Sequence, residues 1–488
     1  MSRFVLAIDI GTTSTKVLAV TAQGEVLCSH QEFYPTYFPL PDHVEQNAED
    51  IRKAVLASIH RVVTLLSHPP LALSLSCAMH SFLVVDGTGL SHSPVLIWSD
   101  TRSYEQAQSL HQSSLGKMIA QRSGTPVHPM SPLCKIKWWM LHHPVRPEHR
   151  FVSIKEYILY HLTGQWTVDH SLASATGLFD IQHNTWMQES LDWAGIDLKR
   201  LSEPVPTTTF LSLTPAACTN LGLPHSTQLM IGASDGCLAH HAFDLLPEEW
   251  SLTVGTSGAV RLSRSTPLIH PEGKIFNYIL THQKFVSGGA TNHGTVLIDW
   301  FNQNIAKKAV PVDLFTSVLT NYKPGSNGLL FLPYILGERA PFYDAKARGA
   351  WIGLGIRHTL EDMQQALLEG MCFEINSIIQ MLSQIAHVPT KLVMSGGLTR
   401  SSAWVQLLSD ITQMPIEIRH KSDASSLGAG RLAFEALGMS YQDSSVDVQL
   451  FTPSSRHLDM HQKLMAMFIE TTQRMTPVFH SLAQWQRL

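Results

Sequence analysis

The residues with the clearest potential for chemistry stand near the start of the chain, in residues 8–16 (IDIGTTSTK). Apolar residues flank this segment, which predicts a strand, a tight turn and a second strand. Gly11 lets backbone N–H groups approach an anion, and the short side chains around it add donors, charge and a carboxylate. The residues that would form such a phosphate turn are Asp9 (for hydrated Mg²⁺), Thr12, Thr13, Ser14 and Lys16. For this segment alone, an ordinary hairpin with a hydroxyl-rich turn is the alternative.

A second copy of this plan occurs far down the chain. Trp250–Val254, the turn Gly255-Thr256-Ser257-Gly258 and residues 259–262 again read as strand, turn and strand. Two similar phosphate turns predict two similar domains that face one nucleotide. A classical P-loop would need Gly, four residues, Gly, Lys and Ser or Thr, and the sequence has no such segment.

A third glycine site lies at residues 392–404, which predict a strand, a Gly396-Gly397 turn and a helix start beside Ser401. Two glycines there allow a flat base or a phosphate to lie against the backbone. A plain strand-to-helix turn is the alternative. The order of the sites along the chain favours a nucleotide site.

An acid stands between the two phosphate turns, in the segment 232–236 (GASDG). This segment leads into a predicted helix, Cys237–Phe243, so Asp235 lies at a helix start. A carboxylate there could accept the proton of an attacking hydroxyl. The alternative is an N-cap, for which Asp is also favoured.

Hydrophobic periodicity and the positions of turn residues predict the helices and strands that position these residues. We expect strands within 4–28, at Leu71–Cys77, at 82–85 and at 95–98, and helices at Asn47–Leu66 and Ser153–Leu162. A domain boundary near 244–249 gives domains 1–245 and 246–488, which suits a chain of 488 residues because single cores stop growing near ~250–300 residues.

Composition narrows the classes of function. A net charge of −4 and the lack of basic runs argue against binding to nucleic acid or an anionic membrane. No apolar run reaches 18 residues, so no membrane span is expected. Six cysteines without metal spacing predict reduced thiols in a cytoplasmic protein. The paired histidines are adjacent rather than three or four apart, which disfavours a structural metal.

The two phosphate turns resemble those of the sugar kinase, Hsp70 and actin superfamily. Over nearly its full length the chain resembles the FGGY carbohydrate kinases, through seven ordered motifs: IDIGTTSTK, WSDTR (98–102), DHSLASATGLFDI (169–181), ASDG (233–236), VGTSG (254–258), LGERAPFYDAKARGAWIGL (336–354) and SGGLTRSSAWVQLLSD (395–410). Residues 78–81 and 124–138 look most like gluconokinases, with xylulokinases next.

The resemblance implies an α/β fold of two RNase H-like domains with a nucleotide cleft between them, ATP and Mg²⁺ as cofactors, and Asp235 as the catalytic base. It implies a sugar site of Met79, His80, Trp98 and Gly236, and a nucleotide site of Thr12, Thr13, Ser14, Lys16, Gly255, Thr256, Gly294, Gly397 and Ser401. Many relatives have Asn or Gln where Gly236 stands, and the third motif reads Gly-Gly-Leu rather than Gly-Gly-Gly.

The expected reaction is phosphorylation of an open-chain sugar acid by ATP, D-gluconate to 6-phosphogluconate. A ketopentose kinase such as xylulokinase and a nucleotide-binding sugar sensor without turnover are the alternatives. The substrate carboxylate calls for a cation, and Arg102, His128, Lys135 and His80 are the candidates. A small molecule is the expected partner, and a homodimer is left open.

Overall fold

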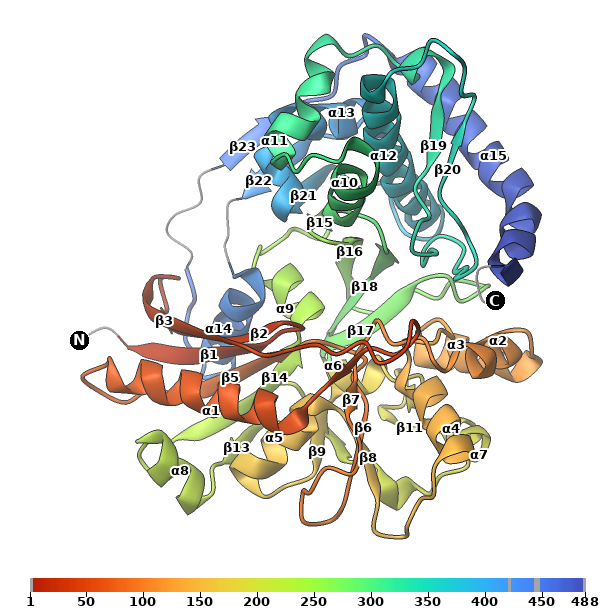
Figure 1. Cartoon of the computed structure of the whole chain (residues 1–488). Coiled ribbons are helices and arrows are strands. Elements are labelled where there is room, and N and C mark those ends of the chain that lie inside the picture. Colours follow the sequence, from red (N-terminus) through yellow and green to blue (C-terminus); the bar gives the residue numbers. More distant parts are fainter. Residues whose placement is uncertain (1–2, 420–422, 443–447, 486–488) are drawn as a thin grey trace. The chain divides into compact units, whose positions relative to one another are not determined.

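The computed structural model describes residues 3–419, 423–442 and 448–485, and the chain divides into two compact units (Figure 1). The first unit comprises Met1–Asp244, Arg264–Ser287 and Ser422–Ser445, and the second comprises Leu245–Ser263, Gly288–Lys421 and Val446–Leu488. The predicted domains 1–245 and 246–488 are each continuous in sequence, and they stay a prediction. The two compact units are not continuous, because Arg264–Ser287 and Ser422–Ser445 belong to the first unit.

The first unit is built on a six-stranded sheet (Figure 1). Its order is β13 (Phe210–Ser212), β14 (Gln228–Ser234), β5 (Leu73–Cys77), β1 (Phe4–Ile10), β2 (Ser14–Thr21), β3 (Val26–Phe33). The central strands β14, β5 and β1 are parallel, whereas β1, β2 and β3 form an antiparallel meander. Every residue of β5 is buried, as expected for a central parallel strand.

Helices and short strand pairs complete the first unit. The helices are α1 (Ala48–Thr64), α2 (Tyr104–His111), α3 (Ser114–Ser123), α4 (Pro132–His142), α5 (Ile154–Thr163), α6 (His170–Ser174), α7 (Gln188–Ala194), α8 (Pro215–Leu221), α9 (Asp235–His241) and α14 (Ala424–Ala436). The pairs are β4 (Glu45–Gln46) with β7 (Val95–Leu96), β6 (Leu83–Val85) with β8 (Arg150–Val152), β9 (Thr167–Asp169) with β12 (Glu203–Val205), and β10 (Phe179–Asp180) with β11 (Thr185–Trp186).

A seven-stranded sheet follows a similar plan. Its order is β17 (Phe276–Thr281), β18 (Lys284–Thr291), β16 (Gly258–Arg264), β15 (Glu249–Val254), β21 (Lys391–Ser395), β22 (Ile416–Arg419), β23 (Val448–Phe451). Here β15, β21 and β22 are parallel, and β15 forms an antiparallel hairpin with β16, as β1 does with β2. Of this sheet, β17 and the start of β18 belong to the first unit. The second unit further contains α10 (Thr295–Phe301), α11 (Val312–Phe315), α12 (Leu360–Ile385), α13 (Ser402–Thr412), α15 (Leu458–Trp485) and the pair β19 (Leu330–Leu332) with β20 (Ala350–Ile352).

Local signals in the sequence placed several of these elements correctly, among them β5, α1 and α5. Asn47 caps α1 by accepting from the N–H groups of Glu49 and Asp50, and Ser153 forms a capping box with Glu156 at the start of α5. The helix predicted from Cys237 begins two residues earlier, at Asp235, and Ser234 is its N-cap position. The α/β class is therefore confirmed.

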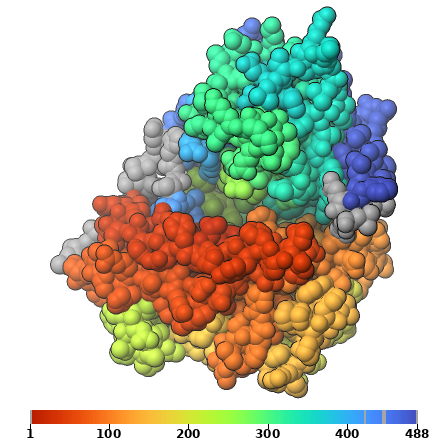
Figure 2. Space-filling view, in the orientation of Figure 1, coloured from red at the N-terminus to blue at the C-terminus, as the bar shows by residue number. Residues whose placement is uncertain are grey.

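The N-terminal segment, red in Figure 2, forms much of the face of the first unit shown there. Within it, Phe33 at the end of β3 and Phe38 in the loop that follows are largely exposed, whereas Tyr34 is buried. All six cysteines are free thiols, and five are buried. Over the described residues, no helix is long and apolar enough to cross a membrane, and no group of three or more His, Cys, Asp or Glu is arranged to hold a metal ion.

Glu156, in the capping box of α5, makes the stability of the fold depend on pH. Burial raises the pKa of Glu156 from 4.5 to about 7. The folded state therefore binds this proton more tightly than the unfolded state, so its contribution to stability is full below pH 4.5 and is lost as pH rises through 7.

Replacing Glu156 by Gln keeps a residue suited to the capping box and removes the titration. Between pH 4.5 and pH 7.5, the wild type should lose up to about 3 kcal/mol of unfolding free energy relative to Glu156→Gln. Denaturant unfolding of both proteins across this range would measure the difference. A difference that stays constant with pH would contradict the prediction.

Candidate active site

The turn between β1 and β2 is closed by its own backbone and held from outside. The N–H of Gly11 donates to the carbonyl of Ser14 at 3.0 Å. Tyr34 Oη donates to the carbonyl of Gly11, and Gln46 Nε2 to that of Thr12, each at 2.5 Å. These carbonyls are thereby turned toward protein donors. Thr13 is exposed at the tip of the turn, where a phosphate could reach it.

Asp9 and Lys16, cross-strand neighbours in this hairpin, both have partners within the first unit. Ser76 Oγ and Ser425 Oγ each donate to Asp9 at 2.7 Å, and Lys16 Nζ lies 2.7 Å from the carboxylate of Asp423. Burial raises the pKa of Asp9, which the two hydroxyls oppose. Asp423 therefore compensates the charge that we expected Lys16 to direct at phosphate.

The carboxylate of Asp9 and its hydrogen bonds fit a magnesium ion that is bound through water. Both carboxylate oxygens already accept a hydroxyl proton, yet each oxygen retains a lone pair for a further donor such as a coordinated water. Asp9 is the residue that would hold the ion, which would neutralise charge on phosphoryl oxygens when bound.

Asp235 follows the last residue of β14 at the carboxyl edge of the first sheet. Ser234 pairs with Cys77 of β5, and Cys77 pairs with Ile10 of β1, so the three parallel strands end side by side. Gly232 makes this register possible: its φ is +68°, and a Cβ there would lie 1.8 Å from the carbonyl oxygen of Leu75.

The predicted sugar residues begin at the same edge, because Met79 and His80 directly follow β5. His80 has a φ of +66°, which is rare for a residue with a side chain, and is almost fully buried. Its Nδ1 donates to the carbonyl of Ala175 at 3.0 Å, and Tyr278 Oη lies 3.4 Å from its Nε2. The ring is thus fixed in one orientation.

Trp98 and Gly236 complete the predicted sugar set. Trp98 Nε1 donates to Thr12 Oγ1 at 3.3 Å, which joins the expected apolar wall of the sugar site to the first phosphate turn. Gly236 is buried, and its N–H donates to Asp235 Oδ1 at 2.7 Å. The structure therefore brings Asp235 and Gly236 together, and Trp98 to Thr12.

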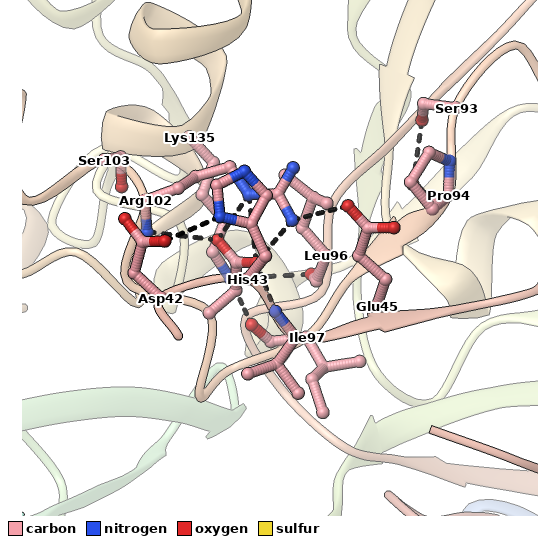
Figure 3. A network of polar contacts seen from close by, with 12 residues as sticks. Asp42, His43, Glu45, Ser93, Pro94, Leu96, Ile97, Arg102, Ser103 and Lys135 are labelled. Carbon is pink, nitrogen blue, oxygen red and sulfur yellow. Dashed lines mark hydrogen bonds and ion pairs between the residues drawn. The ribbon is translucent and has the colours of Figure 1, made fainter. Parts of the chain in front are cut away.

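Two of the predicted carboxylate-binding cations are occupied by the protein itself (Figure 3). Arg102 pairs with Asp100 at 2.7 Å and with Glu45 at 2.6 Å, and its side chain is 4% exposed. Lys135 is fully buried and donates to the carbonyls of His80 at 2.8 Å and Ile97 at 2.7 Å. Neither is available to bind a substrate carboxylate as we expected, and burial lowers the pKa of Lys135 to about 7.

Lys135 has a role that sequence reasoning missed. The carbonyls it binds belong to His80 and to the residue before Trp98, so α4 fixes the backbone of both sugar-site segments. These segments are 55 and 38 residues from Lys135, and no local spacing pattern signals such a contact. His128, the fourth candidate, is half-buried, and its Nδ1 accepts from the N–H of Met130 at 3.2 Å.

Within the second unit, three of the predicted glycine sites meet. The N–H of Thr295 donates to the carbonyl of Gly255 at 2.8 Å, which places Gly294 against the second turn. Gly396 has a φ of +102°, and a Cβ there would lie 2.3 Å from the carbonyl oxygen of Val254. The hydroxyl-bearing Thr256 is exposed on this turn.

The remaining two nucleotide-site candidates flank the start of α13. Gly397 is half-buried, and a Cβ there would meet Thr295 at an ordinary 3.5 Å. Ser401 is the N-cap: its Oγ accepts from the N–H of Trp404 at 3.2 Å and donates to Thr316 Oγ1 at 2.6 Å. Its hydroxyl is therefore used by the helix start, the alternative that the sequence had left open.

Two α/β units, each with a Gly-Thr turn between antiparallel strands, are the arrangement that the resemblance predicts, and the comparisons identify the family. Residues 4–241 match the FGGY family of carbohydrate kinases, N-terminal domain, and residues 250–437 match the C-terminal domain of that family. The chain belongs to the FGGY family of carbohydrate kinases. The predicted family and fold of two RNase H-like domains are thereby confirmed, while the cleft between the domains stays a prediction.

Relatives of two substrate classes are similar over nearly the whole chain. Gluconokinase of Bacillus subtilis is 33% identical, covering 100% of this chain and 99% of its own length. Xylulose kinase of Staphylococcus xylosus is 28% identical, covering 88% and 90%. The crystal structure of gluconate kinase from Lactobacillus acidophilus has a TM-score of 0.93 at 28% identity, covering 99% of this chain and 100% of that one.

The contact between Gly294 and the second turn can be tested by adding one methyl group. A Cβ at Gly294 would lie 2.2 Å from the backbone oxygen of Gly255, which cannot swing away as a side chain would. We expect Gly294→Ala to cost about 1–3 kcal/mol of stability through overpacking and to weaken nucleotide binding.

Thermal unfolding and nucleotide titration would measure the two effects. Gly355→Ala is the matched control, because a Cβ there meets only the His358 ring, at 3.7 Å. Equal behaviour of the two variants would show that the second turn tolerates the displacement.

Proposed function

We propose that this protein is a gluconokinase, which transfers the terminal phosphoryl group of ATP to the 6-hydroxyl of D-gluconate. The observation that carries the proposal is the shared carboxyl edge of β14, β5 and β1, where an acid, a buried His and a phosphate turn begin. Ligands of α/β proteins bind outside the carboxyl ends of parallel strands.

In the proposed reaction, Asp235 accepts the proton of the attacking hydroxyl. A sugar hydroxyl is a poor nucleophile at neutral pH, so its proton must leave as the bond to phosphorus forms. The N–H of Gly236 donates to Asp235 Oδ1 at 2.7 Å and so orients the carboxylate at the start of α9. Met79, His80 and Trp98 would orient the sugar.

The nucleotide sites are proposed separately for each unit. In the first unit, the backbone N–H groups and hydroxyls of Thr12, Thr13 and Ser14 would contact phosphate, with Lys16 charge-compensated nearby. In the second unit, Gly255, Thr256 and Gly294 would contact phosphate or ribose, and Gly397 the adenosine. Ser401 would contribute through the helix start that it caps.

Gluconate is favoured over xylulose by the higher identity to a gluconokinase and by two histidines that could bind the carboxylate of gluconate. The gluconokinase of B. subtilis is similar over the full chain at 33% identity, against 28% over 88% for the xylulose kinase of S. xylosus. Arg102 and Lys135 bind protein groups, and His128 and His80 also contact protein groups. The two histidines are proposed as partners of a substrate carboxylate because they lie in the two segments, 124–138 and 78–81, that look most like gluconokinases. Xylulose stays the second candidate, since a relative of that class covers most of the chain.

The base is tested by Asp235→Asn, which keeps the shape and removes the proton acceptor. We expect the variant to fold and bind ATP with kcat lowered ~10²–10⁴-fold. Coupled ADP-release kinetics and ATP titration give the two readouts. A kcat near the wild-type value would leave Asp235 a structural role only.

The substrate class is tested with gluconate, xylulose, ribulose, glycerol and the neutral six-carbon polyol sorbitol in the same assay. We expect the highest kcat/KM for gluconate. In His128→Gln or His80→Gln, loss of a charge-assisted hydrogen bond should lower kcat/KM for gluconate by roughly 10–100-fold and that for sorbitol much less.

His142→Gln is the matched control, since His142 is an exposed histidine at the end of α4. A wild-type kcat/KM higher for xylulose than for gluconate would overturn the gluconate assignment and leave the role of Asp235 untouched.

A further inference from the structure

A buried ion pair lies against the segment that leads into the proposed base, Asp235, and the proposed reaction does not use it. Lys155 Nζ on α5 is 2.6 Å from Asp169 Oδ2, and the side chains are 1% and 0% exposed. Taking both charges out of water is costly, and apolar residues of similar volume are often as stable. The pair is therefore a candidate for a function other than stability.

The pair is bonded directly to the segment that carries Asp235. Lys155 Nζ donates to the carbonyl of Ala233 at 3.2 Å, two residues before the base. Asp169 Oδ1 accepts from the N–H of Leu172 at 2.9 Å and so caps α6. The pair thus joins the end of β14 to the start of α6.

A second contact ties the same two elements together. Ser171 Oγ on α6 donates to Ser234 Oγ at 2.9 Å and accepts from the N–H of Ser234 at 3.2 Å. The last two residues of β14, Ala233 and Ser234, are consequently held by α5 and α6. The backbone that leads into Asp235 has little freedom to move.

The opposite side of α9 is closed by α14 of the same unit. A Cβ at Gly428 would lie 1.9 Å from the carbonyl oxygen of Leu238, so the two helices are in backbone contact. Asp235 therefore stands at the start of a helix that is confined on one side by α14 and at its base by Lys155 and Ser171.

We propose that Lys155 is a positioning residue for phosphoryl transfer: through Ala233 it fixes the start of α9, and with Asp169 it keeps the charge beside Asp235 balanced. The inference rests on the proposed role of Asp235. It assigns Lys155 and Asp169 no contact with substrate.

Charge balance matters because the base lies on a helix that has other ionisable groups along it and packed against it. Those on α9 and on α14, β5 and β17, which pack against it, are Cys77, Cys237, His240, His241, Tyr278, Arg431 and Glu435. Beside the pair itself lies Glu156 on α5, whose pKa Asp169 helps to raise. None of these residues is replaced in either variant. The effect of Asp169 on Glu156 is lost in Asp169→Asn but kept in Lys155→Gln, so the comparison uses the direction of the shift in both variants.

The two charges act on Asp235 in opposite directions. Without the cation, the remaining Asp169 carboxylate disfavours a second anion nearby. Without the anion, the remaining Lys155 favours an ionised Asp235. A role in backbone packing alone would give no such difference in sign.

The experiment compares the pH dependence of kcat/KM for gluconate, or for the best substrate found, in Lys155→Gln and Asp169→Asn. Both replacements keep hydrogen-bonding groups and remove one charge. We expect the acid limb to move up in Lys155→Gln and down in Asp169→Asn, by roughly one pH unit, the size of shift that a nearby unit charge gives.

The double variant K155Q/D169N has no charge at either position, so its acid limb should return toward the wild-type pH while kcat stays reduced by the altered contact with Ala233. Should Lys155→Gln fail to fold, Asp169→Asn and the double variant still test the sign. Asp180→Asn, which breaks the Arg122 pair at a buried Asp of the same unit, is the control and should leave the acid limb unmoved.

Acid limbs that coincide with the wild type, or that move in the same direction in both variants, would overturn the proposal. The Asp235→Asn variant separates this outcome from failure of the proposed function. If Asp235→Asn retains activity, the base itself is wrong. If it is inactive and the two limbs coincide, only the role of the pair is wrong.

Discussion

The parallel alignment of β1, β5 and β14 is the constraint on which the proposed site depends. Parallel strands end at one edge, and the pairing of Ile10 with Cys77 and of Cys77 with Ser234 sets those ends level. The phosphate turn, the His80 segment and Asp235 each leave the sheet there. A slip of one residue in β14 would turn its side chains to the other face of the sheet. Gly232, with its positive φ beside the Leu75 carbonyl, makes the local register possible.

Buried lysines hold the segments that leave this edge. Lys135 bonds the carbonyls of His80 and Ile97, and Lys155 bonds that of Ala233. A buried ammonium group with three donors can satisfy several carbonyls that lie outside regular structure, where no strand or helix would pair them. Burying the charge costs free energy, and this cost is reflected in the pKa of Lys135, which burial lowers to about 7. Such an arrangement gives loops the rigidity of the core.

The similar turn of the second unit is held by a different kind of contact. Its Gly255 turn is packed by backbone contacts with the Gly294 and Gly396 segments, whereas the Gly11 turn is held by the side chains of Tyr34 and Gln46. Backbone-to-backbone packing tolerates no Cβ, which explains why glycines recur in the second half. One sheet plan thus carries two turns of similar sequence with different support.

Local patterns predicted the strands and helices around the two turns, the turns themselves and the α/β class, and the ordered motifs predicted the family. Such predictions succeed because strand and helix signals and N-caps are local: Asn47 and Ser153 cap the predicted helices. Motifs also singled out Asp235, Thr12 and Gly255. The partners of the charged side chains were visible in the folded chain alone. Lys16, Arg102 and Lys135 were expected to meet anions of the ligands, yet Asp423, Asp100 and backbone carbonyls occupy them. The partner of a long cationic side chain is set by which segments the fold brings within a few ångströms, and the spacing of residues along the chain carries no record of that distance.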